Sequence, residues 1–429
     1  MLAVSRFLVR YILPWFIRIC GWVSAFGIFY YTLWVLVLVL GSIREPWRRK
    51  RDFALAAGYH LYVMMPMLNE AGVVNSTLSK FLENTTSIDQ ITLLVIDDGS
   101  DDGTGDLIKQ FIAAHHCEKK IALLQRFKPN AQTGKGNALN FGLNYIRKLA
   151  STDHERTIVG VLDADAVMKE KDFKNVILEY VVHPQLALLQ TKVRMIKVHN
   201  WLELMQDVEF ATVNDWIQRV RNVIGNAAAS GNGQFIRLSA MDDKQSPWGN
   251  ALLEDFEFST NFLLKGAQTK YCSDIVVYQE AVNKTKPFIR QRSRWVQGGL
   301  DCAQKYFSRV VKSPELGFWA KFEMVFFMLL PFFTVLVGFS NLVILLYACG
   351  HFVHFIGLFV FLLGAVTALS YYMAFKYALN DFRISPKLVI ICSTMTIYNV
   401  ILFPAILIAF YRKITGASSW IKTAHGVQS

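Results

Sequence analysis

The sequence predicts an α/β domain of the doubly wound type, set between apolar segments long enough to cross a membrane. Two observations lead to this prediction. From about residue 59 to residue 301, short continuous apolar runs alternate with stretches of helical periodicity, which is typical of a mostly parallel sheet covered by helices. Both ends of the chain instead contain long apolar runs, and 53% of its 429 residues are apolar.

Five short apolar runs in the middle region have the composition of strands that are buried on both faces of a sheet. The predicted strands cover residues 62–65, 92–96, 121–124, 158–162 and 186–190, and the predicted helices cover 72–83, 104–114 and 136–149. In sheets of this kind, ligands bind outside the carboxyl ends of the strands. Polar residues that directly follow a predicted strand are therefore the first candidates for a site.

The apolar segments at the two ends predict a multi-pass membrane protein. Residues 21–40 form one uncharged apolar stretch, close to the ~20 residues needed to cross the hydrocarbon layer. The segment before it contains Arg6, Arg10 and Arg18 and has the pattern of an interfacial amphipathic helix. Three further candidate spans cover about 325–347, 352–375 and 388–411.

The last of these spans would place Arg412 and Lys413 on the outer side, against the positive-inside tendency. A count that is one span higher or lower also fits the sequence. The basic cluster at residues 44–51 follows the first span and indicates that the middle domain faces the cytosol.

The charge distribution indicates a lipid bilayer rather than nucleic acid as the partner of the basic residues. The chain carries 45 Lys and Arg against 33 Asp and Glu, and the excess lies mostly beside the apolar spans. Six cysteines without CxxC spacing argue against a metal or disulfide framework. They fit a reducing compartment.

Acidic residues cluster after three of the predicted strands. Glu70 follows the first, Asp97 and Asp98 follow the second within DDGS, and Asp163 and Asp165 follow the fourth as DxD. Two carboxylates at i and i+2 can direct oxygens at one hard divalent cation and leave positions for phosphate oxygens. A lone DxD is more often a turn or a solvated strand end. Its place after a buried strand, together with DDGS, favours a metal site.

Charged residues precede two predicted helical segments. Lys135 lies between glycines just before a helix, where backbone N–H groups favour an anion. The spacing is not that of a P-loop, and a surface lysine at such a place is common. Glu254 and Asp255 precede another helical segment, and a carboxylate there can accept a proton from an attacking hydroxyl. The helix dipole alone also favours acidic residues at a helix start, so both interpretations stay open.

The segment QRSRW at residues 291–295 is the most specific in the chain. On a helix, Gln291, Arg294 and Trp295 share one face. That face offers an amide, a guanidinium suited to phosphate oxygens and an aromatic surface on which a sugar ring can stack. The alternative is a basic interfacial helix with its tryptophan at the headgroup level, which the arginines of this segment also suit.

The order DDGS, DxD, ED and QxxRW, in a domain bracketed by apolar spans, resembles the processive family 2 glycosyltransferases such as cellulose, hyaluronan and poly-N-acetylglucosamine synthases. The resemblance runs from Pro66 through the C-terminal spans. It implies a GT-A fold and inverting transfer of a sugar from a UDP-sugar to a growing polysaccharide. It also implies four regions: residues 1–50 with the first span, a cytosolic GT-A domain at 51–285, interfacial helices at 286–323, and about three spans at 324–429.

The resemblance assigns roles at the donor sugar. Asp97 and Asp98 would contact the nucleoside, while Asp165, with Asp163 nearby, would hold Mg²⁺ or Mn²⁺ on the diphosphate. Further contacts to the donor are expected from Glu70, Lys135, Glu254, Gln291 and Arg294.

The resemblance also assigns roles at the acceptor. Asp255 would be the general base, and Trp295 would stack under the acceptor sugar. The usual TED reads LED here, and the acceptor-side segment reads GNGQF, unlike the Cys-Gly segment of cellulose synthases. Within it, Asn232 and Gln234 are candidate readers of acceptor hydroxyls.

Two alternatives to a polysaccharide synthase stay open. A non-processive enzyme of the same kind would move one sugar to a membrane lipid. A transporter or structural membrane protein would only bind a nucleotide, but it would not need a base such as Asp255, and charges would line a permeation path. The sequence does not separate UDP-glucose from UDP-N-acetylglucosamine, and it does not identify accessory subunits.

Overall fold

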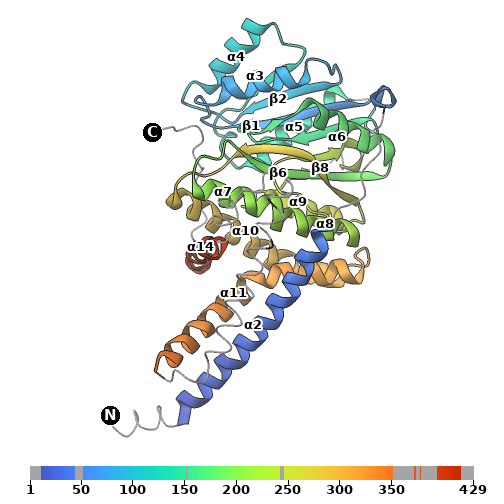
Figure 1. Cartoon of the computed structure of the whole chain (residues 1–429). Helices are drawn as coiled ribbons and strands as arrows, with labels where there is room; N and C mark the ends of the chain where they lie inside the picture. The colour runs from blue at the N-terminus through green and yellow to red at the C-terminus, as the bar shows by residue number, and fades with distance from the viewer. Residues whose placement is uncertain are drawn as a thin grey trace.

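The computed structural model describes residues 11–43, 52–150, 153–241, 246–350, 372, 377 and 394–416. In Figure 1, an α/β domain lies at one end, and helices α2 (Leu13–Gly41) and α11 (Phe318–Gly350) project from it side by side. These two helices contain the predicted spans at 21–40 and 325–347. The basic cluster at 44–51, Arg6, Arg10 and nearly all of the predicted span at 352–375 lie outside the described residues.

One eight-stranded sheet organises the domain, in the order β3-β2-β1-β4-β7-β6-β8-β5. The first four strands in the sequence are parallel, and they are β1 (His60–Met67), β2 (Ile91–Asp97), β3 (Ile121–Gln125) and β4 (Thr157–Val161). The other strands are β5 (Val167–Met168), β6 (Leu186–Ile196), β7 (Gln234–Arg237) and β8 (Gln268–Glu280). β7 is antiparallel to both β4 and β6. All the predicted strands are present, but β7 makes the sheet mixed rather than wholly parallel.

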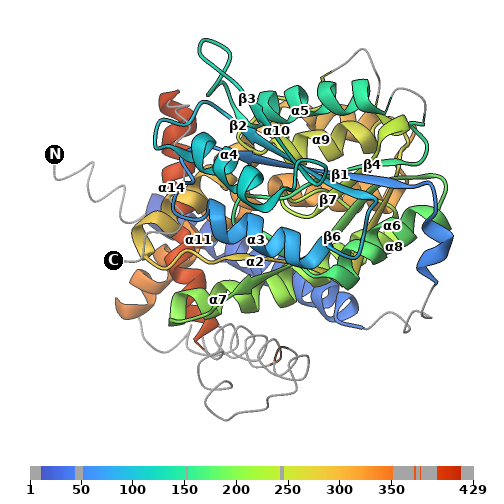
Figure 2. The same cartoon turned by 90° about the horizontal axis from the view of Figure 1, so that it is seen from above.

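Helices cover both faces of this sheet, as Figure 2 shows. One face packs against α3 (Val74–Thr85), α4 (Thr104–His115) and α6 (Glu170–Val182), and the other against α5 (Lys135–Leu149) and α9 (Glu254–Leu263). Val63 belongs to the first core and its neighbour Met64 to the second, because successive strand side chains alternate between faces. Burial on both faces explains why these strands are continuous apolar runs.

A layer of helices lies between the sheet and the projecting helices. It consists of α7 (Trp201–Glu209), a π-helical turn η3 (Phe210–Asn214), α8 (Asp215–Ile224), α10 (Thr285–Lys312) and α14 (Met395–Thr415). α14 packs along α10. It is seen end-on in Figure 1 and lengthwise in Figure 2, so it runs across the direction of α2.

The basic end of α14 lies against α10, since Lys413 forms an ion pair with Asp301. The side of a membrane on which Arg412 and Lys413 lie stays a prediction, and in the structure Lys413 contacts α10.

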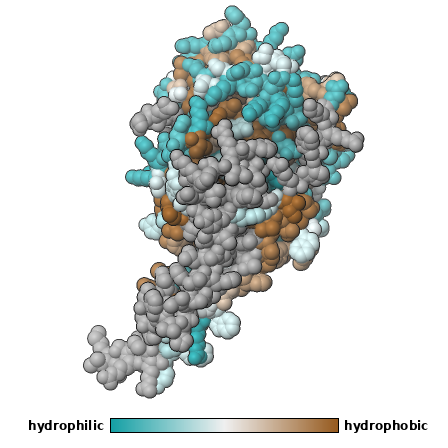
Figure 3. All heavy atoms as spheres, viewed as in Figure 1, coloured by the Kyte–Doolittle hydropathy of each residue, from teal (hydrophilic) through white to brown (hydrophobic). Residues whose placement is uncertain are grey.

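Two helices in the described part of the chain are long and apolar enough to cross a membrane, at Phe318–Ile344 and Ile397–Thr415. Large apolar side chains on their surfaces are exposed, including Phe339 and Val400. In Figure 3, hydrophilic residues predominate over the upper part of the α/β domain, and an apolar patch lies lower down, near the level from which the long helices project.

An ion-pair clamp fastens α11 to the α/β domain. Arg221, in the last turn of α8, donates from Nε to Glu323 Oε1 of α11 at 2.9 Å. Asn226 donates to the other oxygen of the same carboxylate at 2.7 Å. Both arginine and carboxylate are nearly buried, with 8% and 12% of their side chains exposed, so the clamp fixes where α11 leaves the domain.

Candidate active site

The loops after β1, β2 and β4 meet at one edge of the sheet. The Asp98 amide donates to the Met67 carbonyl at the end of β1 at 2.9 Å, and the Leu162 amide donates to the Met64 carbonyl at 3.1 Å. DDGS and DxD therefore lie on either side of the β1 end. Because β2 and β4 flank β1 in the sheet, this edge is the place where such folds bind ligands.

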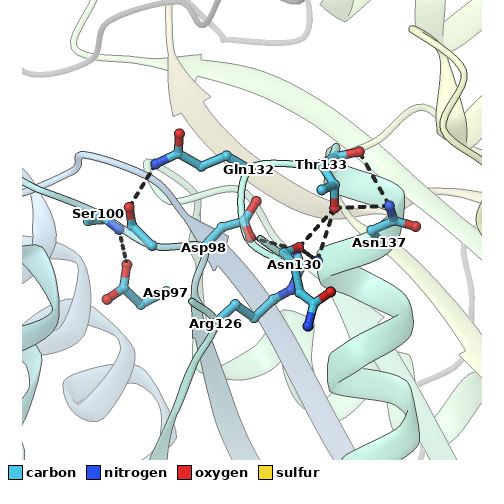
Figure 4. A network of polar contacts seen from close by, with 9 residues as sticks. Asp97, Asp98, Ser100, Arg126, Asn130, Gln132, Thr133 and Asn137 are labelled. Carbon is cyan, nitrogen blue, oxygen red and sulfur yellow. Dashed lines mark hydrogen bonds and ion pairs between the residues drawn. The ribbon is translucent and has the colours of Figure 1, made fainter. Parts of the chain in front are cut away.

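Figure 4 shows a polar network built around the DDGS loop. One oxygen of Asp97 accepts from the Ser100 amide at 3.0 Å, and the other accepts from Gln125 at 3.2 Å. Asp98 forms a buried ion pair with Arg126, which also donates to Thr133 Oγ1 at 3.2 Å. The DDGS carboxylates are thus held by the segment that follows β3.

Burial raises the pKa of Asp98 above its ordinary value, although the Gln132 backbone and the Arg126 cation act in the opposite direction. Arg126 was missed by the sequence analysis. A single arginine after a strand belongs to no motif, and its only signal is its position at the end of β3, beside the strand that carries DDGS.

Glu70 is buried in the loop after β1, next to the N-terminus of α4. Its amide donates to Thr104 Oγ1 at 2.8 Å, and the preceding Asn69 amide donates to Ser100 Oγ at 2.9 Å. The β1 loop is therefore attached to the DDGS loop. The structure places Glu70 at the same sheet edge as Asp97 and Asp98.

A cluster of opposite charges forms where α5, α9 and the DxD loop meet. Lys135 Nζ lies 2.6 Å from Asp163 Oδ1 and 3.5 Å from Glu254 Oε1. Burial lowers the pKa of Lys135, but Asp163, Glu254 and Asp255 outweigh burial and raise it above the ordinary lysine value. Lys135 is therefore a fixed cation that links the strand-end motif to the start of α9.

Arg294 belongs to the same electrostatic cluster. Burial lowers its pKa, and the carboxylates of Glu254 and Asp163 act against that effect. The structure thus brings together residues that are far apart in the sequence, from α5, the DxD loop, α9 and α10. Gln291 and Trp295 are partly buried on the same helix α10, as the helical spacing predicted.

Asp255 lies at the start of α9, which begins at Glu254 rather than after Asp255. Burial and the neighbouring Glu254 carboxylate raise the pKa of Asp255 to about 7, against the influence of the Phe256 amide and Lys135. A Cβ atom built on Gly231 would lie 3.2 Å from Asp255 Oδ2, and Gly231 has a φ of +79°. The GNGQF segment therefore borders this carboxyl group.

Asn232 and Gln234 lie inside the domain. Asn232 Oδ1 accepts from the Asp163 amide at 3.3 Å, and its Nδ2 donates to Gln279 at 2.9 Å. Gln234 is completely buried in β7. The two side chains lie behind DxD, and in the structure Asn232 supports the DxD backbone.

The DxD carboxylates form a donor set of hard oxygens at one strand end. Asp165 is nearly buried and its Oδ2 accepts from the Glu280 amide at 2.9 Å. Among the described residues, no group of three or more His, Cys, Asp or Glu side chains is arranged to hold a metal. Two carboxylates suit a hard cation whose remaining positions are filled by phosphate oxygens and water, so the residues present fit Mg²⁺ or Mn²⁺.

A mixed sheet with DDGS and DxD at one edge, and Asp255 near the Lys135 that contacts DxD, is the arrangement expected of a glycosyltransferase of the GT-A fold. The chain belongs to the glycosyl transferase family group 2, whose model matches residues 158–410. The model of glycosyl transferase family 2 matches residues 62–237. Together the two matches extend from β1 to α14.

Similar proteins act on polysaccharides. The probable glucomannan 4-beta-mannosyltransferase 4 of Oryza sativa subsp. japonica is 24% identical over 62% of this chain and 47% of its own length, so the chain spans about half of that relative. The poly-beta-1,6-N-acetyl-D-glucosamine synthase of Staphylococcus epidermidis is 25% identical over 68% of this chain and 69% of its own.

The fold is similar to a solved structure, the mannosyltransferase PcManGT from Pyrobaculum calidifontis in complex with GDP-Man and Mn²⁺. The TM-score is 0.55 at 16% sequence identity, over 91% of this chain and 99% of that one. This likeness concerns the fold, and it confirms the GT-A architecture expected from the sequence.

Proposed function

We propose that this glycosyltransferase transfers a sugar, with inversion, from UDP-glucose or UDP-N-acetylglucosamine to a growing polysaccharide at a membrane. The observation that carries this proposal is the convergence of Lys135, Asp163, Glu254 and Arg294 beside Asp255. Such a cluster offers cations for a diphosphate and a base for a hydroxyl within one site. The names of the relatives support a polysaccharide product.

The donor half of this site binds the nucleotide. Asp97 and Asp98 contact the nucleoside, with Arg126 holding Asp98 in place. Asp165 and Asp163 would hold Mg²⁺ or Mn²⁺, which would supply positive charge for the diphosphate. Arg294 and Lys135 add positive charge on the protein side. Gln291 and Glu70 complete the polar lining.

Asp255 is the catalytic base of the proposed reaction. The acceptor hydroxyl oxygen forms a bond to the anomeric carbon, its proton passes to the Asp255 carboxylate, and the bond from that carbon to the diphosphate oxygen breaks. Attack opposite the leaving group inverts the configuration. A base whose pKa lies near the working pH combines the correct charge with a strong drive for proton transfer, and Asp255 meets this condition with a pKa of about 7.

The acceptor half of the site lies toward the apolar helices. Trp295 on α10 provides a ring on which the acceptor sugar stacks. We infer that residues 51–285 and 286–323 face the cytosol, that the long apolar helices, with α2 and α11 among them, cross the plasma membrane, and that the polymer leaves beside them. Attachment of α11 to α8 through Glu323 supports a product path next to the catalytic domain.

Replacing Asp255 with Asn tests the base. We expect sugar transfer to fall by about 10²- to 10⁴-fold, because a carboxamide cannot take the proton. Donor binding, measured by titration of the purified protein with UDP-sugar, remains. The matched control is Asp274→Asn, which makes the same change at an exposed position of β8. Near-normal turnover of Asp255→Asn would show that the base assignment is wrong.

The length of the product tests the acceptor. Vesicles that contain the protein are incubated with each labelled UDP-sugar, and the product is separated by size and digested with linkage-specific hydrolases. We expect a long polymer built from one of the two sugars. A lipid that carries one sugar would instead assign the chain to the non-processive enzymes.

A further inference from the structure

Arg292 lies within the QRSRW segment but has no part in the donor site. Only 9% of its side chain is exposed. Its guanidinium forms a bidentate pair with Glu209, with NH1 3.1 Å from Oε1 and NH2 2.7 Å from Oε2. A buried charge is tolerated only where it is paired and hydrogen-bonded, and a planar fork of this kind also fixes orientation.

Three aromatic rings surround the Arg292 guanidinium. Its central carbon lies 4.3 Å from the centre of the Trp295 ring, 5.1 Å from Phe288 and 5.7 Å from Phe210. All three distances are within the range of cation–π attraction, which is strongest for tryptophan and for a desolvated cation. The cation covers one face of the Trp295 ring. A sugar can therefore stack only on the opposite face.

The partner of Arg292 lies at an irregular turn. Glu209 ends α7, and the π-helical turn η3 begins at Phe210. Phe210 also packs edge-on against Trp295, with ring centres 6.5 Å apart. Single π-helical turns occur frequently at functional sites. Here the turn brings the Glu209 carboxylate and the Phe210 ring, from successive residues, into contact with Arg292.

The same cluster includes a residue of α14. The Tyr398 hydroxyl donates to Glu209 Oε2, and Arg292 NH2 donates to the Tyr398 oxygen at 3.3 Å. The Tyr398 and Phe288 rings also lie 5.4 Å apart. Glu209, Arg292 and Tyr398 thus join α7, α10 and α14 at one point beneath Trp295. Figure 1 shows these three helices together in the layer below the sheet.

We propose that Arg292 is a positioning residue that holds the Trp295 ring in place for the acceptor sugar and ties that ring to α14 through Glu209 and Tyr398. This inference rests on the proposed function, because it takes Trp295 as the acceptor platform. Because the Arg292 guanidinium already fixes one face of the Trp295 indole, the indole loses little rotamer freedom when a sugar binds its other face. Acceptor affinity therefore depends on Arg292, although Arg292 does not touch the sugar. Movement of α14 is transmitted to the acceptor site by the same contacts.

The test uses the full chain in vesicles and the variant Arg292→Lys. Lysine keeps the charge but loses the planar fork and the stacked guanidinium. We expect KM for an acceptor oligosaccharide to rise about tenfold, with shorter products and unchanged affinity for UDP-sugar. The matched control is Arg290→Lys, since Arg290 is exposed on the same helix. An acceptor KM equal to that of the unmodified protein would overturn the inference.

Tyr398→Phe is a milder variant that keeps the ring and removes only the hydroxyl. We expect a smaller rise in acceptor KM and an unchanged melting temperature. Equal losses of acceptor affinity, donor affinity and thermal stability in both variants would show a structural role only, and would also overturn the inference. Trp295→Ala separates the two proposals. If Trp295→Ala leaves the acceptor KM unchanged, Trp295 is not the acceptor platform and that part of the proposed function is wrong. If Trp295→Ala raises the acceptor KM but Arg292→Lys does not, only the positioning role of Arg292 is rejected.

Discussion

The two halves of the candidate site are built in different ways. On the donor side, Asp97 ends β2, and Asp98 and Asp163 follow parallel strands, where the Asp98 and Leu162 amides donate to carbonyls of β1. On the acceptor side, Asp255 and Trp295 stand on helices α9 and α10, which pack against the apolar helices α11 and α14. The proposed donor half therefore depends on the sheet, while the proposed acceptor half depends on helices that pack against the long apolar helices.

This difference predicts which substitutions affect the donor and which affect the acceptor. If the proposed function is right, we expect a change at the strand ends to alter nucleotide binding, and a change in the helices beneath to alter acceptor binding while the nucleotide stays in place. Lys135 lies at the junction, because it contacts Asp163 of the donor half and Glu254 at the start of α9.

On the donor side, the largest effect is expected from removal of the divalent cation. A strong chelator, or Asp165→Asn, should lower transfer by about 10³-fold, since the diphosphate then leaves without its counter-charge. In the chelated protein, added Mg²⁺ or Mn²⁺ should restore activity. Activity is measured by the release of UDP. Transfer that persists in a strong chelator would contradict the metal role of Asp163 and Asp165.

A smaller effect is expected at the junction. Lys135→Met should lower kcat/KM for the donor by about 10²-fold, because it removes a preorganised positive charge beside the diphosphate. It should also raise the pKa of Asp255, since Lys135 acts to lower it. Lys109→Met, at an exposed ion pair on α4, provides the control. A loss of acceptor affinity without any loss for the donor would place Lys135 in the acceptor half.

The acceptor half should control the pH profile. Burial and Glu254 raise the pKa of Asp255 to about 7, so the carboxyl group is protonated below that pH and cannot accept a proton. Transfer should fall about tenfold for each pH unit below the midpoint, while donor binding changes little.

Glu254→Gln should move this midpoint to lower pH, because removal of the adjacent negative charge makes the ionised form of Asp255 easier to form. The profile is measured as kcat/KM for the acceptor across the pH range. A midpoint that stays in place in Glu254→Gln would show that another group controls the profile.

The last prediction concerns packing at the start of α5, and its main effect is on stability rather than on turnover. A Cβ atom on Gly136 would lie 1.9 Å from the Gly249 carbonyl oxygen, so Gly136→Ala should lower the free energy of unfolding by about 1–3 kcal/mol. Gly299→Ala on α10, where nothing lies within 4 Å of the added atom, is the control and should be neutral or slightly stabilising. Chemical denaturation measures both. Equal free energies of unfolding for Gly136→Ala and Gly299→Ala would contradict the close contact between position 136 and the Gly249 carbonyl.

Much of the donor half could be predicted from the sequence because its signals are local. Each parallel strand is a largely continuous apolar run, and the polar motif lies at its end or within a few residues after it, as with Asp97 and Asp98 at the end of β2. β7 could not be predicted, since its four residues include buried Gln234 and Arg237 and lack the apolar character of a central strand.

The sequence was less informative for residues whose contacting side chains come from distant segments of the chain. Arg126 and Arg292 each look like ordinary basic residues, and only the fold brings them to Asp98 and Glu209. The raised pKa of Asp255 likewise depends on burial beneath segments far away in the chain. The sequence suggested a carboxylate at this place, but the tertiary structure determines its proton affinity.

The clamp between Arg221, Asn226 and Glu323 bears on how the proposed polymer synthase could advance its product. Both oxygens of one carboxylate are engaged by the domain, so tilting the domain on α11 would break two hydrogen bonds and leave a nearly buried charge without partners. The clamp therefore resists tilting of the domain relative to α11. In the proposed synthase, stepwise movement of the product would then come from the polymer itself or from helices that this clamp does not hold.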